Sequence, residues 1–509
     1  MKIRSLAVGL VLLIPPITTT LLGSSPAILG PDRYAMPASV QTRANRLRVL
    51  LEAGSYEVLQ GRLNLFTADD CKYAIKRLGN CMGNNPTAPY VIPSVPLWQD
   101  EYADGTMRDL LGPTANHTWW THRFDPREAI VILGLLPPHG RYFGIQSYAF
   151  SRQTSLNTSD SIYRAATDPF MKNVLFLGSP NPSRLLVFSS LGDSQNNVTI
   201  ERQSGGAFEQ ERSFIITPDA VMERNLRGAL LQAGVPDQKQ IFTEPVSADI
   251  ARLGLDAPAD DFMTLIRYAL PANEAAGNDW RKHIPLVIFR VRDRNTARAT
   301  EPYPAPVLED RVANSELGLK GDADRLVEAV KLRWGQPTAP TSSFFSLRLA
   351  VDLLGKHCLL RPMNCLGDSS DADYQASATE GLDSGQVLAV VGTLGTATGN
   401  AIYTSLSLNW LPPLKGVANI TDEALTGSAS SYFAPGIATD KFYLHYFARD
   451  CRNLRNCLTV TPDLVPVGHL LKIIQRNYIV PGSNRGPDPS RVLNPTLVVL
   501  NGSSRPSEE

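Results

Sequence analysis

The first hydrophobic feature of the chain is an apolar run over residues 6–14, preceded by Lys2 and Arg4 and followed by two prolines. Small residues follow at 25–27. A basic start, a short apolar core and a small-residue cleavage site are typical of a secretory signal peptide. The run is shorter than the roughly 20 residues that cross a bilayer. We therefore expect residues 1–27 to be removed and the mature chain to be secreted or periplasmic, without a transmembrane segment.

Five later segments are predicted to be helices. Residues 39–53 carry a leucine stripe, with Ser39 as the candidate N-cap and Gly54 at the end. In residues 67–78, acidic side chains near the start and basic ones near the end complement the helix dipole. The other three predicted helices are 219–232, 322–334 and 467–476.

Short runs rich in β-branched and aromatic residues predict strands between these helices. Strand 213–217, helix 219–232 and strand 240–246 form a local βαβ unit, whose two strands we expect to be parallel. The rest favours antiparallel sheets, so the predicted fold class is α+β. The other predicted strands are 128–136, 141–150, 184–190, 197–203, 262–270, 284–292, 386–392, 400–410, 441–448 and 495–500.

Proline-rich stretches on both sides of helix 322–334 indicate the main boundary between two major regions. No repeat of fixed period indicates a solenoid or a propeller. The predicted organisation is an N-terminal α+β region (39–300), a linker with one helix (301–340), a C-terminal β-rich region (341–500) and a polar tail (501–509).

The composition is that of a globular protein, with 43% hydrophobic and 19% charged residues. Lys and Arg number 49, and so do Asp and Glu. Removal of the signal peptide leaves a small excess of acid. Such a chain gives no reason to expect nucleic acid or an anionic membrane surface as a partner.

The six cysteines occur as three neighbouring pairs. An even number in an exported chain predicts disulfides. The alternative is zinc, with His357 beside Cys358, but paired zinc ligands usually have two to four residues between them, fewer than here. No metal site is therefore predicted from the cysteines. The predicted disulfides are Cys71–Cys81, Cys358–Cys365 and Cys451–Cys457.

Gly192-Asp193-Ser194 follows a predicted strand and resembles the first block of the GDSL-type ester hydrolases. The resemblance implies Ser194 as a nucleophile next to Asp193, with a histidine as its base. The family's Asp-x-x-His block is absent, which leaves His445 and His469 as candidate bases. The alternative is a simple turn, which Gly-Asp-Ser often forms.

Two further groups of side chains are candidates for binding. Trp119 and Trp120 could stack on a sugar ring, and His139 and Arg141 lie at a loop between two predicted strands. Ordinary core packing is the alternative for the tryptophans. These four residues would bind a small-molecule or glycan ligand.

An acidic cluster at Asp368, Asp371 and Asp373 could hold calcium, because this ion prefers oxygen ligands on loops. The EF-hand pattern fails, however, since Ala376 and Leu382 stand where glycine and glutamate are required. A solvated loop is the alternative, and no other cofactor is predicted.

The chain contains neither Gly-x-Ser-x-Gly nor His-Glu-x-x-His. We therefore expect an exported, disulfide-stabilised protein that binds a small or polymeric extracellular ligand in a β-rich cleft. Two alternatives stay open: a secreted ester hydrolase that uses Ser194, and a structural envelope or surface protein. The sequence leaves open whether the protein is an enzyme.

Overall fold

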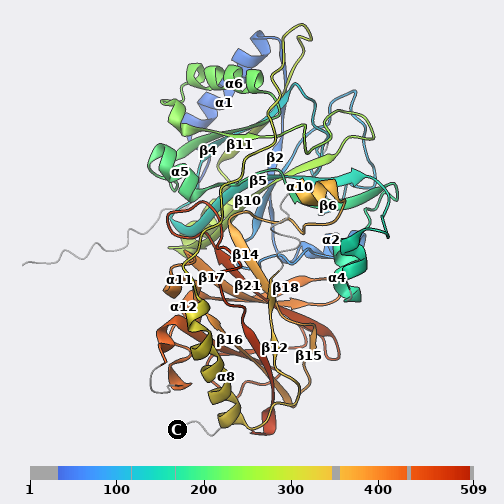
Figure 1. The fold of residues 1–509 in the computed structure, drawn as a ribbon. Helices are drawn as coiled ribbons and strands as arrows, with labels where there is room; N and C mark the ends of the chain where they lie inside the picture. Colours follow the sequence, from blue (N-terminus) through green and yellow to red (C-terminus); the bar gives the residue numbers. More distant parts are fainter. Residues whose placement is uncertain (1–32, 116, 167, 347–355, 433–436, 505–509) are drawn as a thin grey trace, which may run out of the picture.

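The computed structural model describes residues 33–115, 117–166, 168–346, 356–432 and 437–504. The predicted signal peptide lies outside these residues. The chain forms an α+β protein of two regions that are stacked end to end (Figure 1). Antiparallel pairing dominates the sheets of both regions.

Two sheets make up the N-terminal region. Its strands are β1 (Tyr56–Gln60), β2 (Arg62–Phe66), β3 (Tyr90–Ser94), β4 (Glu128–Leu135), β5 (Gly140–Gln153), β6 (Arg184–Ser190), β7 (Gln195–Asn196), β8 (Glu211–Thr217), β9 (Ile241–Pro245), β10 (Asp261–Pro271) and β11 (Leu286–Asp293). The outer sheet has the order β1-β11-β4-β8-β9 and the inner sheet β2-β3-β10-β5-β6, with β7 beside β5.

Two further sheets make up the C-terminal region. Its strands are β12 (Ser342–Ser343), β13 (Phe345–Ser346), β14 (Ala372–Ala376), β15 (Glu380–Gly381), β16 (Gln386–Thr393), β17 (Tyr403–Trp410), β18 (Lys415–Thr421), β19 (Phe442–Ala448), β20 (Cys457–Thr459), β21 (Leu470–Tyr478) and β22 (Thr496–Asn501). The outer sheet has the order β12-β22-β16-β19-β20 and the inner sheet β13-β14-β21-β17-β18, with β15 beside β21.

The two regions repeat one topology. Each strand of the N-terminal order has a counterpart at the same place in the C-terminal order, and the last pair of each outer sheet is parallel. The register agrees as well, because Tyr90 lies opposite Arg267 in one inner sheet and Tyr374 opposite Arg476 in the other. The chain is therefore an internal duplication of one two-sheet unit.

Helices cover the outer sheets, and the inner sheets meet in the middle of the molecule (Figure 1). Leu47 and Leu226 pack helices on the N-terminal outer sheet, and Leu326 and Trp334 pack the helix predicted within the linker on the C-terminal one. The helices are α1 (Ala38–Ala53), α2 (Cys71–Leu78), α3 (Ser161–Ala165), α4 (Pro169–Leu175), α5 (Asn197–Ser204), α6 (Ala220–Ala233), α7 (Glu274–His283), α8 (Lys320–Trp334), α10 (Lys356–Leu360), α11 (Gly395–Thr398) and α12 (Asp422–Leu425).

The predicted βαβ unit is confirmed. Strands β8 and β9 are parallel and α6 connects them. Asp219 accepts a hydrogen bond from the backbone N–H of Val221 at the start of α6, and Gly234 ends the helix with a φ of 107°. This is the local chemistry that caps a helix at both ends.

Three local predictions are wrong. Residues 197–203 form α5 rather than a strand, because the Asn196 side chain caps that helix by accepting from Thr199 N–H. A helix was predicted over 467–476, but residues 470–478 form the strand β21. This strand is buried on both faces after its first residue, so its sequence does not alternate between apolar and polar residues. Ser39 does not cap α1, since Pro37 is at the N-cap and Ser39 Oγ donates to Glu211.

Candidate functional site

Two loops of similar sequence cross between the regions. We call residues 80–85 (Asn-Cys-Met-Gly-Asn-Asn) the N-terminal strap and residues 364–369 (Asn-Cys-Leu-Gly-Asp-Ser) the C-terminal strap. A disulfide ties each strap to the helix before it, Cys71–Cys81 in the first case and Cys358–Cys365 in the second. Both straps are thus fixed at one end by a covalent bond.

Both straps turn through the left-handed backbone region. The φ values are 57° and 65° at Met82 and Gly83, and 59° and 66° at Leu366 and Gly367. In each strap the leading asparagine stabilises the turn, because its side-chain oxygen accepts from the N–H of the first of these residues. Two positive φ values in succession at matching positions are a further sign of the duplication.

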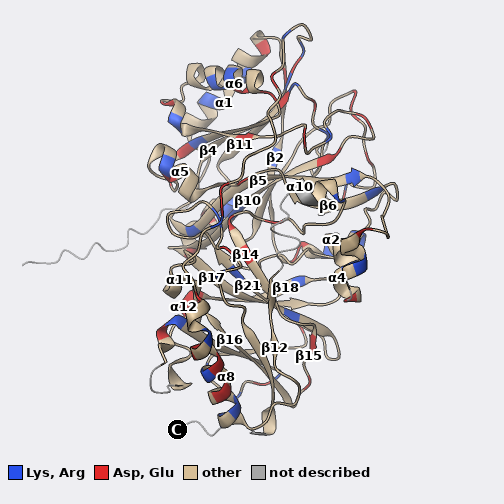
Figure 2. Ribbon diagram, in the orientation of Figure 1, with Lys and Arg blue, Asp and Glu red and all other residues tan. Residues whose placement is uncertain are grey.

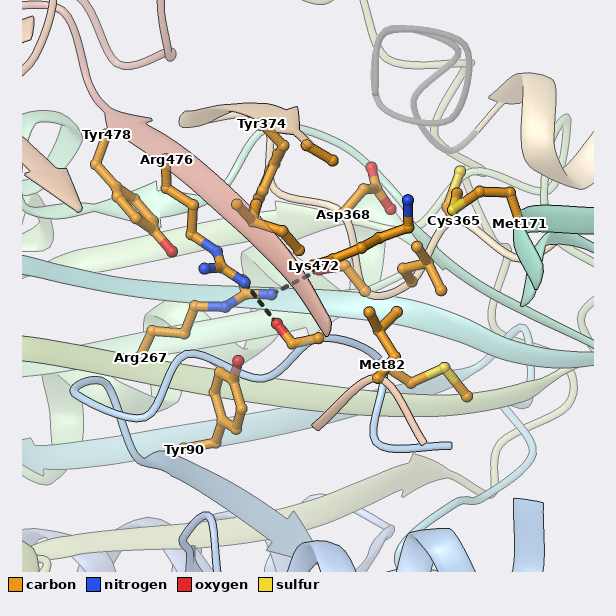
Figure 3. A pocket seen from close by; sticks show the side chains of 16 residues that line it. Met82, Tyr90, Met171, Arg267, Cys365, Asp368, Tyr374, Lys472, Arg476 and Tyr478 are labelled. Atoms are coloured by element: carbon orange, nitrogen blue, oxygen red, sulfur yellow. Dashed lines mark hydrogen bonds between the residues drawn. The ribbon is translucent and has the colours of Figure 1, made fainter. Parts of the chain in front are cut away.

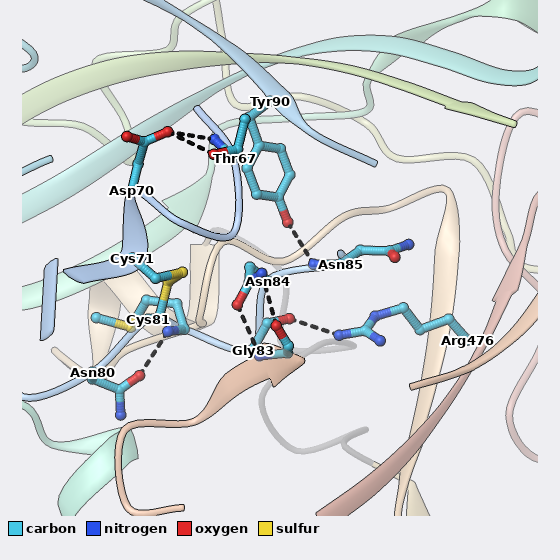
Figure 4. The surroundings of a disulfide bond; sticks show 12 residues. Thr67, Asp70, Cys71, Asn80, Cys81, Gly83, Asn84, Asn85, Tyr90 and Arg476 are labelled. Carbon is cyan, nitrogen blue, oxygen red and sulfur yellow. Dashed lines mark hydrogen bonds between the residues drawn. A yellow bond between two sulfur atoms is a disulfide. The ribbon is translucent and has the colours of Figure 1, made fainter. Parts of the chain in front are cut away.

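The N-terminal strap binds the C-terminal region (Figure 4). Gly83 N–H donates to the Leu414 carbonyl at 2.8 Å, and Arg476 donates to the Gly83 carbonyl at 2.6 Å. Asn84 Oδ1 accepts from Gly416 N–H at 2.8 Å. The strap therefore continues the sheet edge of the opposite region and is held there by an arginine.

The C-terminal strap makes the same contacts in the other direction. Gly367 N–H donates to the Phe188 carbonyl at 2.9 Å, and Arg267 donates to the Gly367 carbonyl at 2.9 Å. The Asp368 carboxylate accepts from both the N–H and the hydroxyl of Ser190. Burial raises the pKa of Asp368 to about 6, although the bonds from Ser190 oppose this shift.

A cavity of about 60 Å³, measured as the space open to the centres of water-sized molecules, lies between the straps and the inner sheets (Figure 3). We call it the cationic cavity, because the side chains of Arg267, Lys472 and Arg476 line it against one carboxylate, Asp368. Its polar and aromatic lining also includes Tyr90, Tyr374 and Tyr478, and Met82, Leu366, Leu414 and Ile474 supply apolar surface.

Aromatic rings position the two guanidinium groups. Arg267 lies 5.8 Å from the ring centroid of Tyr90 and 5.5 Å from that of Tyr148, and Arg476 lies 5.7 Å from that of Tyr374. Such contacts favour a fixed orientation of the cation over the ring face. Because each arginine also donates to a strap carbonyl, both groups are held in place before any ligand arrives.

Lys472 is an almost fully buried lysine, with 1% of its surface exposed. Its ammonium group donates to the Ser377 carbonyl at 3.0 Å and lies 3.9 Å from Asp168. Burial lowers the pKa of Lys472, and the carboxylates of Asp168 and Glu380 oppose this shift. An ammonium with so little solvent gains much from an anionic partner.

Ser194 is buried between the regions, with 2% of its surface exposed. Its hydroxyl donates to the Asp371 carboxylate at 2.5 Å, and the same oxygen of Asp371 accepts from the Tyr142 hydroxyl at 2.8 Å. Ser194 therefore acts as a hydrogen-bond donor to a carboxylate. Its neighbour Asp193 lies 3.2 Å from Arg485 in an ion pair.

The two candidate bases lie elsewhere. His445 is in β19 of the C-terminal outer sheet, with its ring centroid 5.2 Å from that of Phe447. The indole N–H of Trp410 donates to Nδ1 of His469 at 3.1 Å. The structure brings neither histidine into hydrogen-bond contact with Ser194 among the described residues.

The four candidate binding residues have different surroundings. Trp120 is buried and donates to the Gly112 carbonyl, while Trp119 is half-buried under Arg108. His139 is exposed beside Phe208. Arg141 donates across the interface to the Ile402 carbonyl at 3.2 Å and lies 3.5 Å from Asp422.

The acidic cluster Asp368, Asp371 and Asp373 is buried between the regions, so its interpretation as a solvated loop is wrong. Asp368 and Asp371 accept hydrogen bonds from hydroxyl groups of the N-terminal region. Over the described part of the chain, no three His, Cys, Asp or Glu side chains are placed to hold a metal ion.

The predicted disulfides are all present, including Cys451–Cys457. Three disulfides fit a protein that works outside the reducing cytosol. In the residues that the structure describes, every helix is too short or too polar to cross a membrane. Charges of both signs are interspersed along the two regions (Figure 2), in line with the balanced composition.

The sequence interpretation missed the arginines and the straps, although one signal was present. Asn-Cys-x-Gly occurs twice, at 80–83 and 364–367, and a tyrosine follows each copy at the same spacing, Tyr90 and Tyr374. Both copies lie just before a strand of an inner sheet. This pairing indicates a twofold duplication, which a search for solenoid or propeller repeats does not detect.

No family model and no curated protein matches the chain in sequence. Among solved structures, it is similar to an uncharacterised protein from Burkholderia cenocepacia, with 10% identity, 92% of this chain and 96% of that chain covered, and a TM-score of 0.38. It is also similar to PNGF-II, with 9% identity, 91% and 67% covered, and a TM-score of 0.21. At these scores neither likeness assigns an activity to this chain.

Proposed function

We propose that the protein binds a small organic anion in the cationic cavity, after export from the cytosol. One observation carries this proposal: the central strands β10 and β21 contribute equivalent arginines, Arg267 and Arg476, to the same cavity. With Lys472, they give three cations against Asp368. Arginine pairs favour carboxylates because the planar guanidinium can donate two parallel hydrogen bonds.

The lining suits a small ligand better than a polymer. The cavity lies between two regions whose straps cross at its edges, and apolar and aromatic side chains alternate with the cations. Binding pockets commonly combine a mostly apolar lining with a few fixed polar groups. Of the four residues first considered as a glycan site, Trp120 is buried and Arg141 donates to the Ile402 carbonyl, which does not favour a polymer-binding groove.

The test is isothermal titration of the mature, disulfide-bonded protein with small carboxylates, inorganic phosphate and matched uncharged amides. Lys472→Met is the informative variant, because the equivalent position of the N-terminal region is Met263 and the fold accepts methionine there. We expect at least one carboxylate to bind, and Lys472→Met to weaken it about tenfold or more by loss of a buried charge interaction.

Lys320→Met is the matched control, since it removes the same charge from the exposed face of α8. It should bind as the unmodified protein does. If no anion binds, or if Lys472→Met binds every anion unchanged, the proposal is wrong and the arginines serve only to join the regions.

A further inference from the structure

A second cavity of about 60 Å³ adjoins the cationic cavity on the side of the N-terminal region. We call it the apolar cavity, because most of its lining is aliphatic or aromatic. Six of these side chains are Phe66, Leu78, Ile92, Phe150, Met263 and Leu265. Five residues line both cavities: Met82, Tyr90, Arg267, Leu366 and Gly367.

The two cavities are equivalent under the duplication. The pair Tyr90 and Arg267 in the lining of the apolar cavity corresponds to the pair Tyr374 and Arg476 in the lining of the cationic cavity. Along the central strands, Met263 precedes Arg267 by the same number of residues as Lys472 precedes Arg476. The same structural position therefore carries an apolar side chain in one cavity and an ammonium in the other.

A second substitution follows the same division. Asn84 lines the apolar cavity at the strap position that Asp368 occupies in the cationic cavity. At both positions the ionisable residue, Lys472 or Asp368, lines the cationic cavity, and the uncharged residue lines the apolar cavity. The combined space has a charged end and an apolar end, with Arg267 and Tyr90 between them.

We propose that one ligand occupies both cavities, and that it is an amphipathic monocarboxylate with a hydrocarbon tail. This inference rests on the proposed function, since the carboxylate would bind at Lys472 and Arg476. The tail would pass Arg267 and Tyr90 and lie against Met263 and Leu265. Transfer of each methylene from water to such a lining contributes about 0.8 kcal/mol, which corresponds to about fourfold in affinity.

The test is titration calorimetry of the mature, disulfide-bonded protein with acetate, hexanoate and octanoate, and with octanol as the uncharged partner. We expect octanoate to bind about tenfold or more tighter than hexanoate, and octanol to bind much more weakly than octanoate. Equal affinity for hexanoate and octanoate would overturn the inference, and equal affinity for octanol and octanoate would overturn the role of the charged end.

A filling variant locates the tail. Ala74 of α2 lines the apolar cavity and is almost fully buried, so Ala74→Met extends a side chain into that space. It should remove the preference for octanoate over hexanoate and leave hexanoate affinity within about twofold. Met263→Lys is the second variant, because the equivalent position already holds a lysine, and it should also abolish the chain-length dependence.

The outcomes separate this inference from the proposed function. Binding that needs Lys472 but does not depend on chain length supports an anion site and overturns the tail in the apolar cavity. Chain-length dependence that survives both Ala74→Met and Met263→Lys places the tail elsewhere and also overturns it. If no carboxylate binds, this inference is wrong, and if no anion of any kind binds, the proposed function is wrong as well.

Discussion

Arg267 and Arg476 reach across to opposite regions. Each lies on the central strand of its own inner sheet and donates a hydrogen bond to a glycine carbonyl in the strap of the other region. The two distances are 2.9 Å to Gly367 and 2.6 Å to Gly83. Because both guanidinium groups also line the cationic cavity, the contacts that join the regions are the contacts that shape the candidate site. A change in either strap should therefore alter stability and binding together.

The strap glycines offer a matched pair of substitutions. Gly83 and Gly367 have φ values of 65° and 66°, so alanine at either position is strained by about 1–2 kcal/mol. At Gly367 the added Cβ would also lie 2.6 Å from a ring carbon of Phe188, whereas at Gly83 its nearest neighbour is Leu414 at 3.7 Å. Gly367→Ala should therefore lower the free energy of unfolding more than Gly83→Ala, by about 1–3 kcal/mol from overpacking.

Urea unfolding followed by tryptophan fluorescence measures both variants. Gly79→Ala at the end of α2 is the control for left-handed backbone without a neighbour, since its φ is 70° and nothing lies within 4 Å of its Cβ position. Equal losses in Gly83→Ala and Gly367→Ala would show that Phe188 can move aside.

Local patterns were sufficient for much of the fold. The βαβ unit was predictable because Asp219 and Gly234 mark both ends of a helix between two apolar runs. The disulfides were predictable from an even number of cysteines in a chain expected to be exported and from their spacing. Strand β21 was not, because it is buried on both faces and its central arginine and lysine do not alternate with apolar residues.

The candidate site depends on contacts between distant parts of the chain, and these leave little trace in sequence. Ser194 looks like a nucleophile beside Asp193, but its partner is Asp371 in the other region. Arg267 falls in a predicted strand and Arg476 at the end of a predicted helix, and neither local pattern indicates that the two side chains line one cavity. Only the repeated Asn-Cys-x-Gly of the straps could have indicated this arrangement in advance.

Ser194→Ala tests the remaining case for an ester hydrolase. The Ser194 hydroxyl is buried and donates to Asp371, so we expect no labelling of the native protein by a fluorophosphonate. The substitution should instead lower the free energy of unfolding by about 1.5–3 kcal/mol, the usual cost of a lost hydrogen bond to a charged group. Fold-dependent labelling that disappears in Ser194→Ala would show that this serine is a nucleophile.

His445 should make stability depend on pH. Burial lowers the pKa of His445 to about 4, while histidine in an unfolded chain titrates near pH 6.5. As the pH falls below 6.5, His445 binds a proton in the unfolded chain but not in the native protein. The free energy of unfolding therefore decreases until about pH 4, where the native protein also binds the proton. Linkage gives a loss of about 2 kcal/mol between pH 7.5 and pH 5 from this residue.

His445→Phe removes this dependence with little change in packing. The equivalent position on β8 is Phe214, which lies opposite Ile132 as His445 lies opposite Val390. Urea unfolding at pH 7.5 and pH 5 should show that the variant loses about 2 kcal/mol less than the unmodified protein. His139→Phe, at an exposed histidine, is the control. An unchanged loss in His445→Phe would mean that other groups dominate the acid response.

The disulfides should differ in what they support. Cys71–Cys81 closes a short loop and fixes the N-terminal strap, whereas Cys451–Cys457 joins a loop to β20 in the outer sheet, away from the cationic cavity lining. Replacing either pair by alanine should lower the free energy of unfolding by about 2–3 kcal/mol, because loops of similar length restrict the unfolded chain similarly.

Only the first replacement should change binding. Without the Cys71–Cys81 disulfide, Met82 and Gly83 are no longer tied to α2. The Gly83 carbonyl, which accepts a hydrogen bond from Arg476, is then held less firmly in place. We therefore expect the double variant Cys71→Ala, Cys81→Ala to bind the best carboxylate about tenfold more weakly at a temperature where it is still folded, and Cys451→Ala, Cys457→Ala to bind it normally. Equal affinities in both double variants would separate the strap from the site and leave Arg476 positioned by Tyr374 and Ser407 alone.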